Sequence, residues 1–171
     1  KNLKILVTGC VGMIGTQFSE LLMDFGISMI GCDNFARGTK ENLHHLEQYS
    51  ENKKVDFDFH ELDLINGLPD KLLKGVDTVV HLADVVGGIM YVFDNQLDVF
   101  NLSVTIDANV VRAVSNSQVK KYIYAGTACS FPQDLQNSVD SKLFEKDKFP
   151  AHPESSYGWG KLVGELQTKY L

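Results

Sequence analysis

The stretch from Lys1 to Gly15, KNLKILVTGCVGMIG, decides the fold of this 171-residue chain. Its short apolar run, Leu3 to Val7, is typical of a buried strand and leads into glycines spaced G-x-x-G-x-x-G. Apolar residues then recur at helical spacing. The stretch therefore predicts a strand, a glycine turn and a helix.

Each of the glycines has a chemical reason for its position. Gly9 permits a tight turn, Gly12 lets the backbone approach a pyrophosphate closely, and Gly15 lets the helix lie close to the strand. The N–H groups and the positive dipole at the start of the helix would then face the phosphates. Because ordinary glycine-rich turns share this spacing, the glycines alone do not identify a dinucleotide site.

The composition of the chain disfavours several classes of partner. With 16 basic and 22 acidic residues the net charge is −6, and no basic stripe is present to bind nucleic acid. No apolar run is long enough to cross a membrane, and the chain starts directly on a strand. The cysteines Cys10, Cys32 and Cys129 have no paired spacing, which argues against disulfides and a metal site. We expect a cytoplasmic protein without metal, membrane or nucleic-acid partner, in which Cys10 and Cys32 pack as apolar residues.

Strand and helix patterns alternate along the rest of the chain. The expected strands cover residues 27–32, 55–60, 77–83 and 119–125, and the expected helices cover 16–25, 38–50, 94–117 and the segment from Tyr157 onward. This alternation predicts an α/β fold with a doubly wound parallel sheet, a three-layer Rossmann fold. Ligands of such sheets bind at the carboxyl ends of the strands.

The first helix is expected to bury one apolar face against this sheet. That face would consist of Phe18, Leu21, Leu22 and Phe25. Gly26 is the expected residue that ends the helix.

Two aspartates lie at strand ends on the expected ligand edge. Asp33 comes 18 positions after Gly15, about where a carboxylate binds the adenosine ribose in dinucleotide-binding folds. Its charge would repel the 2′-phosphate of NADP, so NAD is the expected cofactor, although the nearby Arg37 could pair with such a phosphate. Asp63 has two interpretations, a contact on the adenine side of the cofactor or an N-cap of the following turn.

Tyr157 and Lys161 have the spacing of an acid–base pair on a helix. At i and i+4 they share one face, so the ammonium group lies within reach of the phenol. An unperturbed tyrosine has a pKa of about 10. A neighbouring cation is expected to lower the pKa of Tyr157, which could then accept a proton from a sugar hydroxyl during hydride transfer.

Together these motifs resemble the extended short-chain dehydrogenase/reductase family of NAD-dependent nucleotide-sugar epimerases and dehydratases. The matching motifs are Thr8-Gly9-x-x-Gly12-x-x-Gly15, Asp33-Asn34-Phe35 with Glu41-Asn42-Leu43, His81-Leu82-Ala83, Asn101 with Thr105, and Tyr157-x-x-x-Lys161. Val86 to Ile89 and Thr127 to Pro132 are similar to the branch that contains GDP-mannose 3,5-epimerases and GDP-fucose synthases. Thr127 replaces the serine usual in that branch. Ala128-Cys129 replaces the Asp-Glu pair of the dehydratases, which disfavours dehydration.

The resemblance implies a role for each matching residue. The implied cofactor-binding residues are Gly9, Gly12, Met13, Ile14, Gly15, Asp33, Asn34, Asp63, Leu64, Leu82, Ala83, Asn101, Tyr157 and Lys161. The implied catalytic residues are Thr127, Cys129, Tyr157 and Lys161, and the implied substrate contacts are Gly87, Gly88 and Thr127. Cys129 would move a proton next to a transient ketone; in the alternative interpretation it is a buried packing residue.

The activity implied by the resemblance is that of an NAD-dependent nucleotide-sugar epimerase, which oxidises a sugar hydroxyl transiently, exchanges a proton and returns the hydride. Two alternatives stay open: an NADPH-dependent epimerase-reductase of the GDP-fucose synthase kind, and a non-catalytic dinucleotide-binding or scaffold protein. The resemblance also implies a homodimer. Because the helical pattern runs to Leu171 without a stop signal, we expect residues 1–171 to be one incomplete NAD-binding domain. This portion would lack the substrate-binding lobe and turn over little by itself.

Overall fold

The chain is organised as two compact units. The computed structural model describes residues 3–138 and 140–171. One unit, the sheet unit, comprises the chain up to Asp84 and Asn109–Tyr124. The other, the helical unit, comprises Val85–Ala108 and Ala125–Leu171.

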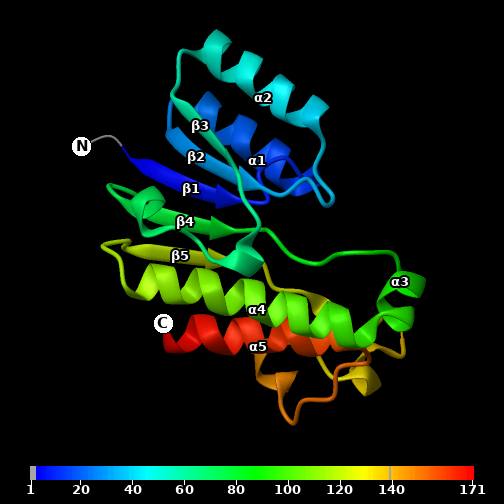
Figure 1. The fold of residues 1–171 in the computed structure, drawn as a ribbon. Helices are drawn as coiled ribbons and strands as arrows, with labels where there is room; N and C mark the ends of the chain where they lie inside the picture. The colour runs from blue at the N-terminus through cyan, green and yellow to red at the C-terminus, as the bar shows by residue number, and fades with distance from the viewer. Residues whose placement is uncertain (1–2, 139) are drawn as a thin grey trace. The chain divides into compact units, whose positions relative to one another are not determined.

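The sheet unit is built on a five-stranded parallel sheet (Figure 1). Its strands are β1 (Lys4–Thr8), β2 (Ser28–Asp33), β3 (Phe57–Glu61), β4 (Thr78–His81) and β5 (Lys121–Tyr124). They are ordered β3-β2-β1-β4-β5, and every neighbouring pair is parallel. The order of the strands reverses between β1 and β4. In a doubly wound sheet, ligands bind outside the carboxyl ends of the strands at this switch point.

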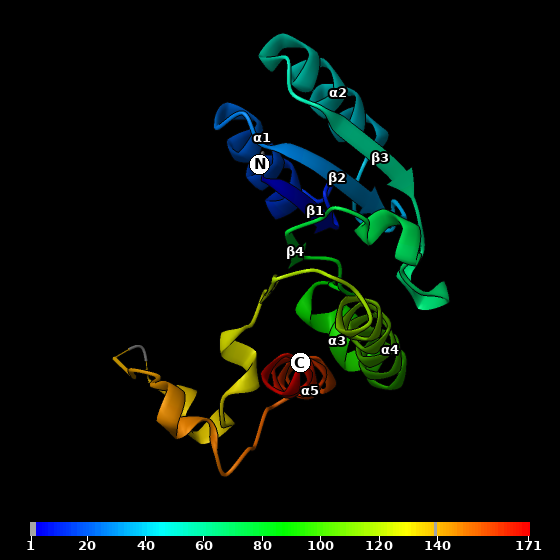
Figure 2. The ribbon, with the colours of Figure 1, turned by 90° about the vertical axis from the view of Figure 1, so that its left-hand side faces the viewer.

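Helices cover both faces of this sheet. Helices α1 (Met13–Asp24) and α2 (Lys40–Lys53) lie on one face, and the portion of α4 (Gln96–Ser115) that belongs to this unit lies on the other (Figures 1 and 2). Because side chains alternate along a strand, Ile5 and Val7 pack into the core on the α1 side, whereas Leu6 points to the opposite face. The predicted doubly wound Rossmann fold is confirmed.

The buried face of α1 differs from the predicted one. The buried residues of this helix are Gly15, Thr16, Ser19, Leu22 and Met23. Leu21 is 50% exposed and Phe25 is 72% exposed, and Phe18 is only partly buried. Leu22 is buried as predicted, whereas the close approach of α1 to the backbone at Gly15 leaves room only for small side chains near that residue. Gly26, with a φ of +69°, follows the helix as predicted.

The helical unit contains the rest of α4 together with two further helices. These are α3 (Ile89–Asp94) and α5 (Ser156–Tyr170), and the short 3₁₀ turns of this unit are η3 (Ala128–Ser130), η4 (Gln133–Gln136) and η5 (Glu145–Lys148). Ser155 is the N-cap residue of α5, and its Oγ accepts the N–H of Gly158 at 3.3 Å. Within the described residues, no helix has both the length and the apolar character needed to cross a bilayer.

Candidate cofactor and catalytic site

Thr8, the last residue of β1, ties the ends of β1 and β4 together at the switch point. Its Oγ1 accepts the N–H groups of Leu82 and Ala83, each at 3.1 Å. Since these bonds use the hydroxyl as an acceptor, its single proton is donated to Nδ1 of buried His81, 2.6 Å away. This network fixes the backbone of Leu82 and Ala83, two predicted cofactor residues.

The three glycines of the turn after β1 differ in how much space surrounds them. Gly9 has a φ of +68°, and a Cβ there would lie 2.8 Å from the Ala83 nitrogen. A Cβ at Gly15 would collide with the Gly9 carbonyl and lie 2.8 Å from Cys10 Cα. A Cβ at Gly12 would meet only the Gly9 carbonyl oxygen at 3.3 Å, and the φ of −74° and ψ of 173° there suit any residue. The fold therefore requires glycine at positions 9 and 15 far more strictly than at position 12.

The start of α1 is open for an anion. Gly12 is the N-cap residue and supplies no side-chain hydrogen bond to the first-turn N–H groups, and that turn contains no acidic residue. The side chains of Met13 and Ile14 are 83% and 63% exposed. Free N–H groups and the positive end of the helix dipole suit a phosphate. The residues present thus fit the pyrophosphate of a dinucleotide.

Asp33 ends β2 beside the glycine turn and is only 8% exposed. Its carboxylate accepts the N–H of Phe35 at 2.8 Å and the N–H of Val11 at 3.4 Å. Burial raises the pKa of Asp33, and these backbone hydrogen bonds oppose the rise. A Cβ at Gly38 would lie 3.0 Å from Asp33 Oδ1, so the segment after β2 returns close to the carboxylate.

Asn42 connects α2 to the glycine turn, a function that the sequence did not reveal. Its Nδ2 donates to the carbonyl of Val11 at 2.9 Å. The sequence had identified Asn42 only as part of a motif. The signal that could have exposed this contact is an amide side chain in a polar helix directly after the Asp33 segment.

The other predicted cofactor residues of the sheet unit lie in local turns. Asn34 Oδ1 accepts the N–H of Ala36 at 2.9 Å. Asp63 Oδ1 accepts the N–H of Ile65 at 3.0 Å and thereby caps the 3₁₀ turn η1 (Leu64–Asn66), while Leu64 is buried. The N-cap interpretation of Asp63 is confirmed, and its contact with the adenine side stays a prediction.

The predicted residues of the helical unit are distributed over α4, the turn before α3, and the η3–α5 region. Asn101 is exposed on α4, where its backbone carbonyl accepts a hydrogen bond from the Thr105 hydroxyl at 2.7 Å. Gly88 is the N-cap residue of α3. A Cβ at Gly87 would lie 2.8 Å from Cγ of the Tyr91 ring, so the turn requires glycine for packing. A substrate role for these two glycines stays a prediction.

Thr127 and Cys129 are held in one short turn after β5. Thr127 Oγ1 accepts the N–H of Cys129 at 3.2 Å and caps η3. Cys129 is exposed, whereas Cys10 and Cys32 are buried. Burial raises the pKa of Cys32 to about 12 and raises that of Cys10 further. The packing interpretation is therefore right for Cys10 and Cys32 and wrong for Cys129.

Helix α5 brings its first turn against this thiol-bearing turn. A Cβ at Gly158 would collide with the Cys129 carbonyl oxygen and lie 2.9 Å from Pro153 Cβ. Glycine is needed there because the backbones of α5 and η3 touch. Tyr157 directly precedes Gly158, and Lys161, which is 5% exposed, lies one turn later on the face that Tyr157 shares. The structure thus places Thr127, Cys129, Tyr157 and Lys161 on two elements in direct contact.

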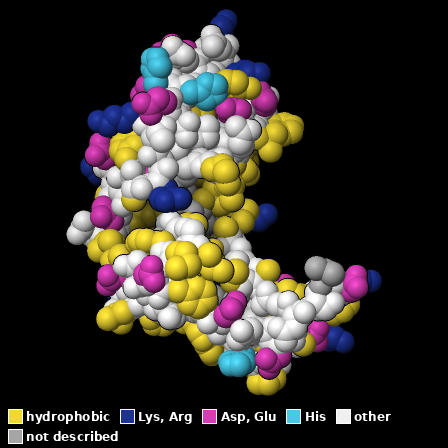
Figure 3. Space-filling model, turned by 90° about the vertical axis from the view of Figure 1, so that its right-hand side faces the viewer, with side chains coloured by type: hydrophobic (Ala, Val, Ile, Leu, Met, Phe, Trp, Pro, Cys, Tyr) yellow, Lys and Arg dark blue, Asp and Glu magenta, His cyan; other side chains and the backbone are white. Residues whose placement is uncertain are grey.

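A separate hollow lies elsewhere on the helical unit. It has a volume of about 420 Å³ and is lined by Gln96, Phe100, Glu154, Ser155, Ser156, Trp159 and Val163. Hydrophobic side chains also gather around α3, where Ile89 and Met90 are 70% and 69% exposed (Figure 3). None of the four predicted catalytic residues lines this hollow.

The homodimer implied by the resemblance stays a prediction.

Comparison with known proteins matches residues 5–171 to the NAD dependent epimerase/dehydratase family. The chain is 31% identical over 173 residues to GDP-mannose 3,5-epimerase 1 of Oryza sativa subsp. japonica, covering 99% of this chain and 43% of the relative. It is 32% identical over 174 residues to GDP-mannose 3,5-epimerase of Arabidopsis thaliana, with the same coverage of 99% and 43%. The chain therefore spans less than half the length of these plant relatives.

A solved structure shows the same fold. The crystal structure of the Bordetella bronchiseptica enzyme WbmH in complex with NAD+ aligns with a TM-score of 0.77 at 24% identity. The alignment covers 99% of this chain and 53% of WbmH.

Proposed function

Because the chain belongs to the NAD-dependent epimerase/dehydratase family, we propose that it is the NAD-binding part of a nucleotide-sugar epimerase. The enzyme would oxidise a sugar hydroxyl transiently, exchange a proton at a neighbouring carbon and return the hydride. The observation that supports this proposal is the contact between η3, which carries Cys129 and is capped by Thr127, and α5, which carries Tyr157 and Lys161.

The sheet unit supports NAD as the cofactor. The uncapped start of α1 offers N–H groups to a pyrophosphate, and the open space at Gly12 admits its close approach. Asp33 would accept hydrogen bonds from the adenosine ribose, and its buried charge disfavours the additional phosphate of NADP. The same observation argues against the alternative NADPH-dependent epimerase-reductase. The remaining residues implied by the resemblance are proposed to line the cofactor.

In the proposed mechanism, bound NAD supplies a hydride acceptor that later returns the hydride. Tyr157 takes the proton of the sugar hydroxyl, and the Lys161 ammonium favours the phenolate form of the tyrosine. The Thr127 hydroxyl orients the reacting oxygen of the sugar. The ketone acidifies the adjacent C–H bond. Cys129, which is exposed, is proposed to act as the base that takes this proton, which leaves an enolate and a Cys129 thiol; after exchange with solvent, a proton is returned to the same carbon. Gly87 and Gly88 are proposed to lie near the sugar.

The substrate class is proposed from the cysteine-bearing turn and the plant relatives. Both relatives are named for a GDP-sugar, and the Thr127 to Pro132 segment was assigned to that branch from its residues. We therefore propose a GDP-hexose as the substrate. GDP-mannose is the first probe, and UDP-glucose is the comparison substrate.

The experiment compares native full-length protein with Tyr157→Phe and Cys129→Ser variants in buffered D₂O. Native protein is expected to incorporate solvent deuterium into the sugar. Tyr157→Phe should lose turnover by about 10²- to 10⁴-fold, because it removes the acid–base group of hydride transfer. Cys129→Ser should retain oxidation but lose deuterium incorporation. Turnover that survives the Tyr157→Phe change would favour a different catalytic group, and a complete lack of NAD binding would favour the scaffold alternative.

A further inference from the structure

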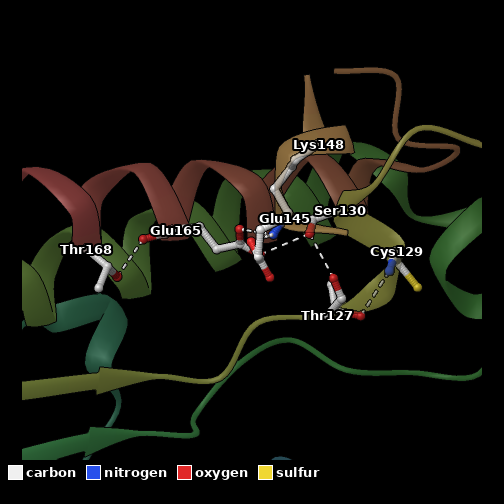
Figure 4. A network of polar contacts seen from close by, with 8 residues as sticks. Thr127, Cys129, Ser130, Glu145, Lys148, Glu165 and Thr168 are labelled. Atoms are coloured by element: carbon white, nitrogen blue, oxygen red, sulfur yellow. Dashed lines mark hydrogen bonds and ion pairs between the residues drawn. The ribbon is translucent and has the colours of Figure 1, made fainter. Parts of the chain in front are cut away.

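Glu165 lies on the face of α5 that carries Tyr157 and Lys161, and it belongs to none of the motifs found in the sequence. It follows Lys161 by four residues and Tyr157 by eight, so the three side chains form one row along the helix. The Glu165 carboxylate accepts the Ser130 hydroxyl at 2.9 Å and pairs with the Lys148 ammonium (Figure 4). Ser130 belongs to η3 and Lys148 to η5. Glu165 therefore joins two turns of the intervening loop to the helix.

The Ser130 hydroxyl bridges the Glu165 carboxylate and the backbone carbonyl of Thr127. The Oγ atom lies 2.8 Å from the carbonyl oxygen of Thr127 and 2.9 Å from Glu165 Oε1. A hydroxyl has only one proton, so these two acceptors share it. A shift of the Glu165 carboxylate therefore changes the hydrogen bonding of Thr127, the residue that caps η3, the cysteine turn.

Gly126 provides the space in which the carboxylate sits. A Cβ at this position would lie 3.1 Å from Glu165 Oε1, closer than a comfortable contact. Gly158 makes the other close contact between α5 and η3, at the Cys129 carbonyl. The cysteine turn is thus held against α5 at two places about two helical turns apart.

Lys148 pairs with the Glu165 carboxylate and holds it in place. It is 8% exposed, and its ammonium lies 4.4 Å from the centroid of the Phe131 ring. Its second carboxylate partner, Glu145, is 3.6 Å away and has a side chain that is 89% exposed. A largely buried lysine needs a close counter-charge, which Glu165 supplies.

We propose that Glu165, paired with Lys148, is a positioning residue that fixes Thr127 and Cys129 against the face of α5 that carries Tyr157 and Lys161. This inference rests on the proposed epimerase function for its kinetic consequence. Its structural consequence, a restrained η3 turn, does not depend on turnover. Glu165 acts through Ser130 and does not touch the reacting atoms.

The test compares Glu165→Gln with Glu145→Gln in the full-length protein. Both variants remove one carboxylate that pairs with Lys148, but only Glu165 contacts Ser130. Hydrogen exchange of the Cys129 and Ser130 amides measures the stability of the turn. We expect exchange at least about tenfold faster in Glu165→Gln and unchanged in Glu145→Gln, because only the former leaves a buried ammonium without its close partner.

Kinetics and thiol chemistry supply independent readouts. Glu165→Gln should lower kcat by about 10- to 100-fold with little change in the KM for the sugar, because the reacting groups are misplaced. The rate of Cys129 alkylation at one fixed pH should rise in the same variant, because the turn that carries the thiol is less restrained. The paired change Lys148→Met with Glu165→Gln removes the unpaired ammonium but does not restore the carboxylate beside Ser130, so its amide exchange should stay faster than in native protein.

Native amide exchange and an unchanged rate of Cys129 alkylation in folded Glu165→Gln would overturn the inference and leave the proposed function standing. Equal effects of Glu145→Gln would overturn it as well, because they would trace to Lys148 alone. Faster exchange in a protein whose Tyr157→Phe variant still turns over would support the restrained turn while refuting the proposed hydride-transfer role.

Discussion

The substitution Gly12→Ala separates the folding requirements of the glycine turn from its proposed cofactor role. The backbone at Gly12 has a φ and ψ that alanine adopts freely, and the added Cβ would meet one carbonyl oxygen at 3.3 Å. A compatible Gly→Ala change stabilises by about 0.4–1 kcal/mol through the unfolded chain. This gain offsets the small displacement that the contact requires. We expect a free energy of unfolding within about 1 kcal/mol of native, or about 2–4 °C in Tm for a chain of this size.

The same methyl group occupies the place where a pyrophosphate would approach the backbone. The loss of one charge-assisted hydrogen bond to a phosphate costs about 1.5–3 kcal/mol, which is about 10- to 100-fold in Kd. Titration calorimetry with NAD measures this loss directly. Thermal unfolding with and without NAD provides the second assay, because a bound ligand raises the Tm of the native protein. The Gly12→Ala variant should show a much smaller rise at the same concentration.

Gly15→Ala is the matched control, because its Cβ would collide with the backbone of Gly9. Overpacking of this kind costs about 3 kcal/mol or more, so its Tm should fall by at least about 6 °C. Native affinity for NAD in Gly12→Ala would refute the pyrophosphate role of the turn. Loss of stability in Gly12→Ala equal to that in Gly15→Ala would refute the packing argument.

Four further predictions concern Thr8, Asp33 and the cysteines. Thr8→Val should lower the free energy of unfolding by about 1–3 kcal/mol in chemical denaturation, whereas Thr8→Ser should stay near native. Valine leaves the part-buried N–H of Ala83 without its acceptor, while the N–H of Leu82 keeps the Thr8 backbone carbonyl. Asp33→Asn should keep or raise the free energy of unfolding at neutral pH, because burial raises the pKa of Asp33 and makes its ionised form costly. The same variant should reduce the preference for NAD over NADP by about tenfold or more in binding titrations. At mildly alkaline pH, an alkylating reagent should modify only Cys129 in folded protein and all three cysteines after denaturation. Because burial raises the pKa of Cys32 to about 12, the free energy of unfolding should fall as pH rises from about 8.5, the unfolded thiol value, toward 12.

Much of the sheet unit could be predicted from local patterns. A strand such as β1 is encoded by a short apolar run, and the turn after it by glycines whose positions the backbone requires. The position of Asp33 at the end of β2 followed from its distance along the chain. The burial of Leu22 on α1 was predictable, but the exposure of Leu21 and Phe25 was not, because the close approach of the helix to the Gly9 carbonyl at Gly15 depends on tertiary packing.

Some features of the candidate catalytic site were likewise predictable from the sequence, and others were not. The spacing of Tyr157 and Lys161 on one helical face is a local property and was predictable. The contact of Glu165 with Lys148 depends on the path of the loop between η3 and α5, which no periodicity in the sequence specifies. The exposure of Cys129 likewise depends on how η3 packs, because cysteine is compatible with either a core or a reactive surface position.

The most direct test of the central claim is rapid-mixing spectroscopy of reduced nicotinamide in NAD-loaded, full-length protein after addition of GDP-mannose. We predict that reduced nicotinamide forms and then disappears in the native protein, and that Tyr157→Phe binds NAD normally but forms it at least about 100-fold more slowly. Equal formation in native and Tyr157→Phe protein would contradict the assignment of Tyr157 as the proton acceptor of hydride transfer.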